Sequence, residues 1–227
     1  MSASTSRVPT GWRLWQLDDP KRTVAAGYDR IGDAYTQDTA LTRVDEREQY
    51  TQALFRLVPS GAHLLELGCG SGIPTTRRLA ERYRVVGVDI SAEQVNRARR
   101  NVPSASFHVA DMTALHFEPG AFDAVAAFYS VIHVPRDQQP QLFAAIHAWL
   151  RPGGLLVATM GAGDDPAGVD DDWFGTPMYW SSFDADTNRK MVTATDFDLV
   201  SADLATADED GQPVTFLWIV ARKPTAP

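Results

Sequence analysis

The sequence predicts an α/β fold with a doubly wound, mostly parallel sheet, helices on both of its faces and further helices at the N-terminus. Apolar runs alternate with helical patterns between residues 64 and 160, as in β-α repeats. Two of these runs, 85–88 and 125–128, are apolar throughout, which is typical of strands buried on both faces. A glycine-rich turn at 68–72 directly follows the run 64–67, as at nucleotide sites on the carboxyl ends of strands.

Length favours one domain. The 227 residues suffice for one sizeable α/β domain and are too few for two. We expect a tail and packing segment at 1–20, with Trp12, Leu14, Trp15 and Leu17, and then a single domain at 21–223. Its first part, 21–60, is expected to form a helical cover.

The net charge and the cysteine content limit the binding partners and the cellular compartment to be expected for this protein. The net charge of -8 and the absence of a Lys/Arg cluster disfavour nucleic acids and anionic membranes as partners. Cys69 is the single cysteine, so an intramolecular disulfide is excluded. No run of residues reads as a secretory signal or a membrane span. We therefore expect a soluble, cytoplasmic monomer or homodimer.

The helices and strands follow from periodicity. Val24, Tyr28, Ile31 and Tyr35 recur at helical spacing and predict a helix over 23–35, followed by a second helix over 43–57. After the glycine turn we expect helices at 75–82, 92–101 and 138–150. The expected strands are 84–88, 106–109, 122–128 and 155–160.

The C-terminal third departs from this alternation. Residues 161–183 are rich in glycine, aspartate and aromatic residues and are predicted to form a long irregular insertion that acts as a lid. A helix at 186–195 and strands at 197–205 and 214–220 follow. The connection at 208–211 is so short that these two strands must be antiparallel.

Five short segments, in this order, carry a family resemblance: ELGCGSG (66–72), GVDIS (87–91), ADM (110–112), FDAV (122–125) and LRPGG (150–154). Together they resemble the class I S-adenosylmethionine (SAM) dependent methyltransferases, over roughly residues 28–220. The resemblance implies a seven-stranded sheet whose last strand is antiparallel. It also implies SAM as cofactor and S-adenosylhomocysteine (SAH) as product.

The resemblance assigns roles to the strand ends. The turn at Gly68, Cys69 and Gly70 would approach the methionine part of SAM, with Glu66 near its amino group. Asp89 follows the first glycine by about twenty residues, where a carboxylate binds ribose hydroxyls; Ser91 is expected to cap the next helix and leave Asp89 free. Asp111 would accept a hydrogen bond from the adenine amino group, and Met112 would cover the ring. The remaining residues expected at the cofactor are Tyr28, Tyr35, Ile90, Gln94 and Phe128.

Each of these residues could also have a role unrelated to cofactor binding. Asp111 could be an exposed loop aspartate, Gln94 a solvated side chain, and the helix with Tyr28 and Tyr35 a simple packing element. A dinucleotide site would need Gly-x-Gly-x-x-Gly, whereas here the third glycine comes two residues after the second. The spacing therefore favours SAM over NAD.

The reacting end is expected at residues 128–135. The segment lacks the Asn/Asp-Pro-Pro-aromatic tetrad of relatives that methylate nucleic-acid amino groups, and the only cysteine lies in the cofactor turn. A small-molecule acceptor remains, with Tyr129 and His133 near the transferred methyl group. His133 is the candidate general base because imidazole titrates near neutral pH; it could instead order the loop.

The insertion would supply the acceptor wall. The expected wall residues are Trp173, Phe174, Met178, Tyr179 and Trp180, which suit a flat or apolar acceptor; a hydrophobic cluster beneath the loop is the alternative. The aspartates at 164, 165 and 170–172 could suggest a Mg²⁺ site, but a solvated acidic loop is favoured and no metal is predicted.

The sequence thus predicts a SAM-dependent methyltransferase that modifies an oxygen or nitrogen of a small aromatic or heterocyclic metabolite, as in secondary-metabolite tailoring. Two alternatives are a SAM-binding protein without methyl transfer and an NAD(P) oxidoreductase.

Overall fold

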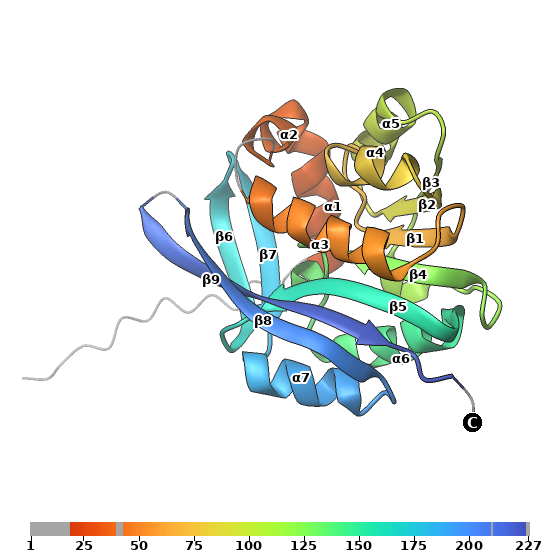
Figure 1. Cartoon of the computed structure of the whole chain (residues 1–227). Helices are drawn as coiled ribbons and strands as arrows, with labels where there is room; N and C mark the ends of the chain where they lie inside the picture. Colours follow the sequence, from red (N-terminus) through yellow and green to blue (C-terminus); the bar gives the residue numbers. More distant parts are fainter. Residues whose placement is uncertain (1–18, 40–42, 210, 226–227) are drawn as a thin grey trace, which may run out of the picture.

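The computed structural model describes residues 19–39, 43–209 and 211–225. Its centre is a seven-stranded sheet with the strand order β3-β2-β1-β4-β5-β9-β8 (Figure 1). The strands are β1 (His63–Leu67), β2 (Arg84–Asp89), β3 (Ser106–Val109), β4 (Phe122–Ala127), β5 (Leu150–Gly161), β8 (Asp198–Glu209) and β9 (Gln212–Arg222). Strands β1 to β5 pair with one another in parallel, and β9 is antiparallel to both β5 and β8. The predicted doubly wound sheet with an antiparallel last strand is confirmed.

Helices cover both faces of the sheet because successive strand residues point to opposite sides. Leu65 and Val125 face one cluster with Phe143 of α6 (Gln139–Trp149), beside α7 (Ala185–Thr193). Leu64 and Ala124 face the other cluster with helices α3 (Val44–Leu57) and α4 (Thr75–Ala80). Helix α5 (Ala92–Asn101) packs beside β3. No helix in the described part of the chain is long and apolar enough to cross a membrane.

The predicted helix over 23–35 is in fact two helices, α1 (Pro20–Ile31) and α2 (Asp33–Thr39). Gly32 separates them with a positive φ of 57°, a conformation that glycine adopts at little cost. At the other end of α1, the Asp19 side chain accepts a hydrogen bond from the Lys21 amide, and Pro20 fits the first helical position. The expected packing segment with Trp12 and Trp15 lies outside the described residues.

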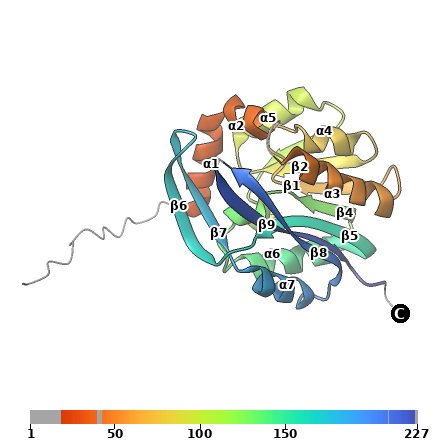
Figure 2. The same ribbon diagram turned by 60° about the vertical axis from the view of Figure 1, so that its left-hand side comes forward.

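The prediction of an irregular insertion is wrong. Strands β6 (Asp165–Trp173) and β7 (Thr176–Ser182) form an antiparallel hairpin. Its turn residues, Phe174 and Gly175, have φ values of 50° and 78°, the left-handed values that tight hairpin turns require. The hairpin lies next to α1 in both views (Figure 2), and β7 packs against that helix.

The strand order reverses between β1 and β4, which opens a crevice at their carboxyl ends. There the chain needs a glycine: Gly68 has a φ of 76°, and a Cβ atom on it would lie 2.2 Å from the Ser130 Cβ. The Ser130 hydroxyl donates to the Leu67 carbonyl oxygen at 2.7 Å, so it cannot retreat without losing that bond.

We expect Gly68→Ala to lower the free energy of unfolding by about 2 kcal/mol or more beyond the loss in Gly70→Ala. Gly70 is a matched control because its φ is also positive, at 52°, while nothing lies within 4 Å of its added Cβ. Urea denaturation of both variants measures the difference. Equal losses would contradict the close approach of Ser130.

Candidate functional site

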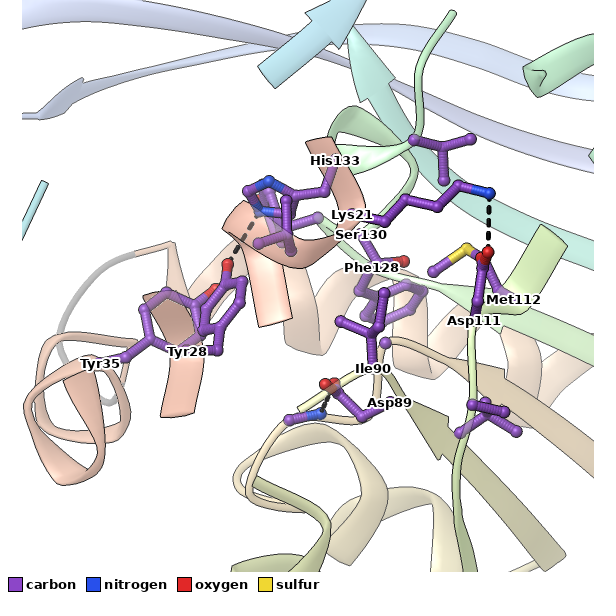
Figure 3. A pocket seen from close by; sticks show the side chains of 17 residues that line it. Lys21, Tyr28, Tyr35, Asp89, Ile90, Asp111, Met112, Phe128, Ser130 and His133 are labelled. Carbon is purple, nitrogen blue, oxygen red and sulfur yellow. Dashed lines mark hydrogen bonds and ion pairs between the residues drawn. The ribbon is translucent and has the colours of Figure 1, made fainter. Parts of the chain in front are cut away.

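A cleft lies at the carboxyl ends of β1 to β4 (Figure 3). The strand ends form its floor, α1 and α2 one side, and the short helix η2 (Val131–His133) the other. Most of the predicted cofactor residues line it, namely Tyr28, Tyr35, Gly68, Gly70, Asp89, Ile90, Asp111, Met112 and Phe128. Side chains far apart in sequence thus meet in one crevice.

Asp89 ends β2 and borders the cleft. It was predicted to be free of backbone hydrogen bonds, but it accepts two. One carboxylate oxygen accepts the Gly70 amide hydrogen at 2.8 Å, and the other accepts that of Ser91 at 2.9 Å. Burial raises the pKa of Asp89. Each oxygen retains a lone pair for a further donor. Ser91 caps α5 as predicted, since its hydroxyl accepts from the Gln94 amide at 3.1 Å.

Asp111 holds an unpredicted partner, Lys21 of α1. The Lys21 Nζ lies 2.7 Å from an Asp111 carboxylate oxygen (Figure 3). The Thr113 amide donates to the other oxygen at 2.9 Å. Burial acts to raise the pKa of Asp111, but the hydrogen bonds from Lys21 and Thr113 outweigh it and the pKa is lowered. Asp111 is therefore charged, and it ties α1 to the end of β3.

Gln94 does not reach the cleft. It is fully buried, and its Nε2 donates to the carbonyl oxygens of Tyr28 and Gly32, each at 3.3 Å. The expectation that it faces a ribose is wrong: the first turn of α5 points it at the end of α1.

Glu66 and Cys69 border a smaller chamber beside the cleft, with Gly68 and Gly70 shared between the two. The Glu66 carboxyl is 2% exposed, and burial raises its pKa to about 8. The Thr76 side chain acts to lower this pKa, but its geometry is too poor to give the Glu66 Oε2 a hydrogen-bond partner among the described residues. A buried carboxyl oxygen without a donor is costly, and an amino group of a ligand would supply that donor.

His133 is held between two hydrogen bonds. Its Nδ1 lies 2.8 Å from the Tyr179 carbonyl oxygen, and its Nε2 lies 2.8 Å from the Tyr28 hydroxyl (Figure 3). A carbonyl only accepts, so Nδ1 carries the hydrogen and Nε2 accepts from Tyr28. Burial lowers the pKa of His133 to about 4. The imidazole is therefore neutral, with its basic nitrogen covered by Tyr28.

A second, larger pocket adjoins the cleft and shares Tyr28, Tyr35, Tyr129 and His133 with it. Three of the predicted wall residues line it, namely Trp173, Phe174 and Trp180. Trp173 is in contact with neighbouring rings, including Tyr28 at 5.7 Å and Trp180 at 5.3 Å between centroids.

Met178 and Tyr179 were predicted in the same wall but do not line it. They are 0% and 3% exposed and pack with Val24 and Ile31 of α1. In β7 both residues belong to the interface with α1 rather than to the pocket.

Tyr129 presents its ring, not its hydroxyl, to the pockets. It has a φ of 54°, and its hydroxyl donates to Glu46 at 2.7 Å. Burial raises its pKa well above the ordinary value. Glu46 also accepts from the Trp218 indole at 3.2 Å and pairs with Arg43 at 3.0 Å.

Several residues at the site were missed in the sequence: Lys21, Arg43, Glu46, Arg47 and Ser130. The spacing of Arg43, Glu46 and Arg47 places them on one helix face, but nothing local shows that this face meets β4 and β9. Among the described residues, no group of three His, Cys, Asp or Glu side chains could hold a metal ion.

Residues 64–154 match a family model described as a methyltransferase domain. A trans-aconitate 2-methyltransferase from Paracidovorax citrulli is 40% identical over 124 residues, which cover 51% of this chain and 46% of that protein. The O-methyltransferase cnsE from Penicillium expansum is 34% identical over 163 residues, covering 66% and 57%. The chain spans about half the length of the curated relatives it matches.

Among solved structures, the DhpI-SAH complex has a TM-score of 0.66 and 20% sequence identity. The match covers 91% of this chain and 98% of that one. The segment order, the sheet order and these matches together support a methyltransferase domain of class I architecture over residues 64–154.

Proposed function

We propose that the protein transfers a methyl group from SAM to an oxygen or nitrogen of a small aromatic or heterocyclic metabolite, in a secondary-metabolite tailoring reaction. One observation carries the proposal: a cleft with carboxylates at the ends of two strands joins, through shared rings, a pocket walled by Trp173, Phe174 and Trp180. The name of cnsE, an O-methyltransferase, supports oxygen as the acceptor atom. The net charge of -8 supports a small molecule, rather than a nucleic acid or a membrane, as the partner.

The residues present fit the cofactor. The unpartnered oxygen of Glu66 suits the amino group of the methionine end. The open space at Gly70 leaves room for a ligand against the backbone, and the remaining lone pairs of Asp89 suit ribose hydroxyls. Asp111 and Met112 would hold the adenine, although Lys21 already occupies part of the Asp111 carboxylate. SAM supplies an activated methyl group on a sulfonium, so the protein has mainly to align the acceptor and exclude water.

The proton of the acceptor has one defined route. Because Tyr28 covers the basic nitrogen of His133, we propose that the acceptor proton passes to the Tyr28 oxygen while the Tyr28 proton passes to His133 Nε2. The Tyr179 carbonyl keeps the other ring hydrogen in place. Because the pKa of His133 is low, the imidazolium returns the proton from Nε2 to the Tyr28 oxygen while Tyr28 gives its own proton to water, and the pair resets. Tyr129 contributes a ring beside the reacting groups.

The direct test is conversion of SAM to SAH with a panel of phenolic and heterocyclic acceptors. We expect SAH to bind in calorimetry and NAD not to bind. Asp89→Asn should weaken SAH about tenfold to a hundredfold, because hydrogen bonds to a charged group are lost. Asp123→Asn, at the opposite end of β4, is the control and should leave SAH affinity intact. Unchanged affinity in Asp89→Asn would refute the ribose assignment, and SAH binding without turnover would favour a non-methylating protein.

His133→Ala and Tyr28→Phe should each lower kcat by about a hundredfold or more with SAH affinity within a few fold, since each removes one step of the proton route. His116→Ala, at an exposed position, is the control. Because the His133 pKa is near 4, kcat should show no His133-dependent fall between pH 8 and pH 6. Steady-state kinetics across pH measures this. If the wild-type kcat instead fell below about pH 6.5, and this fall disappeared in His133→Ala, His133 would be an exposed base.

Glu66→Gln should stabilise the ligand-free protein at alkaline pH. The folded state holds the Glu66 proton up to about pH 8, while the unfolded chain releases it near 4.5. The wild-type free energy of unfolding should therefore fall as pH rises between these values, by at most about 1.4 kcal/mol per unit, and level off above pH 8. Urea titrations at several pH values measure the free energy of unfolding of each variant relative to the wild type. This difference should grow with pH for Glu66→Gln but not for Glu118→Gln at an exposed position. Parallel profiles would place the carboxyl in contact with solvent.

A further inference from the structure

Arg47 stands in the first turn of α3 and borders both the aromatic-walled pocket and the chamber beside Glu66. Its guanidinium carbon lies 4.3 Å from the centroid of the Tyr129 ring. Its Nε is buried without a hydrogen-bond partner. Within residues 19–39, 43–209 and 211–225, no carboxylate forms an ion pair with this guanidinium.

The acids that line this pocket, and Glu46 next to it, do not compensate the charge of Arg47, because each is engaged elsewhere. Glu46 accepts from Arg43, Tyr129 and Trp218. Glu209 pairs with Arg43, and Asp164 pairs with Arg136 at 2.6 Å. Asp165 and Asp208 accept backbone amide hydrogens of residues 167 and 211. Glu66 of the neighbouring chamber feels the charge of Arg47, which acts to lower its pKa, but burial raises the pKa to about 8 and keeps the carboxyl protonated at neutral pH.

Local helix stability does not account for Arg47 either. A cation in the first turn of a helix is disfavoured by the partial positive charge of the free backbone N–H groups. Burying part of a guanidinium without a counter-ion adds a desolvation cost. The contact with the Tyr129 ring offsets part of that cost, but a ring face does not satisfy the N–H donors.

The guanidinium chemistry of Arg47 indicates which ligand group would bind it. A guanidinium presents paired N–H donors that match the two oxygens of a carboxylate. In the same pocket, Trp173, Phe174 and Trp180 form an aromatic wall. We propose that Arg47 determines acceptor specificity by binding a carboxylate, so that the methyl acceptor is an anionic compound with a flat apolar body.

The inference rests on the proposed methyl transfer and names its substrate class. An anionic acceptor would lie between two positive charges, the sulfonium of SAM and Arg47, which would draw it into the pocket and hold it in line. The methionine carboxylate of SAM is the rival partner, because Arg47 also borders the chamber beside Glu66. The two partners are separable by measuring cofactor and acceptor binding independently.

The experiment is calorimetry at pH 8 on SAH-saturated protein with two probes of nearly equal shape, cinnamate and its neutral amide, cinnamamide. The wild type should bind cinnamate about tenfold or more tightly than cinnamamide. Arg47→Gln should abolish this preference, and Arg47→Lys should restore part of it. Arg151→Gln removes the same charge at the exposed pair with Asp123 and should keep the preference. SAH affinity should stay within about threefold in every variant.

Two results would overturn the proposal. The first is a wild type that does not prefer the carboxylate, or that binds neither probe at about 10 mM. The second is an Arg47→Gln variant that loses SAH affinity tenfold while keeping the cinnamate preference, which would assign the guanidinium to the cofactor. A wild type that fails to bind SAH at all would instead contradict the proposed function itself, and the inference with it.

Discussion

The site depends on the close packing of two strand ends, where Ser130, just beyond β4, lies against Gly68, just beyond β1. Only a residue without a side chain allows this approach, and the bond from Ser130 to the Leu67 carbonyl fixes it. The neighbouring Tyr129 adopts a left-handed backbone conformation, and η2 then begins and carries His133 to the border of the two pockets. One contact between two loops thus sets the glycine turn, the shared ring and the imidazole relative to one another.

The opposite side of the cleft is built from the N-terminal helices. Lys21 reaches Asp111, Tyr28 reaches His133, and Gln94 binds the carbonyls at the end of α1. The β6-β7 hairpin supports this helix with Met178 and Tyr179. A ligand in the cleft would therefore be enclosed by an element that is joined to the sheet at both ends by polar contacts.

Charge is distributed unequally along the cavity. Carboxyl groups of Glu66, Asp89 and Asp111 gather at the strand ends, where the cofactor is proposed to bind. Arg47 lies where that region meets the aromatic pocket. Glu66 is protonated at neutral pH and Asp111 is paired with Lys21, so the charge of Arg47 is the feature that favours an anion at the aromatic pocket, as an anionic acceptor would require.

The sequence predicted best those helices and strands whose ends are set by neighbouring residues. The bounds of α5 and β3 match the prediction because capping by Ser91 and short apolar runs are sequence-adjacent signals. The family resemblance placed Asp89 and Asp111 at the cofactor, and both line the cleft because parallel strands end at one edge of the sheet. The hairpin at 165–182 was missed because glycine, proline and aspartate obscure its alternation. Gln94, Met178, Lys21 and Arg47 were misplaced or overlooked because their positions depend on helix-to-sheet contacts between distant segments.

The most direct test of the central claim is a crystal structure of the protein soaked with SAH. We predict adenosine between Asp89 and Asp111 and the amino-acid end beside Glu66, with the sulfur facing the rings shared by the two pockets. An empty cleft, or SAH bound elsewhere on the molecule, would contradict the account.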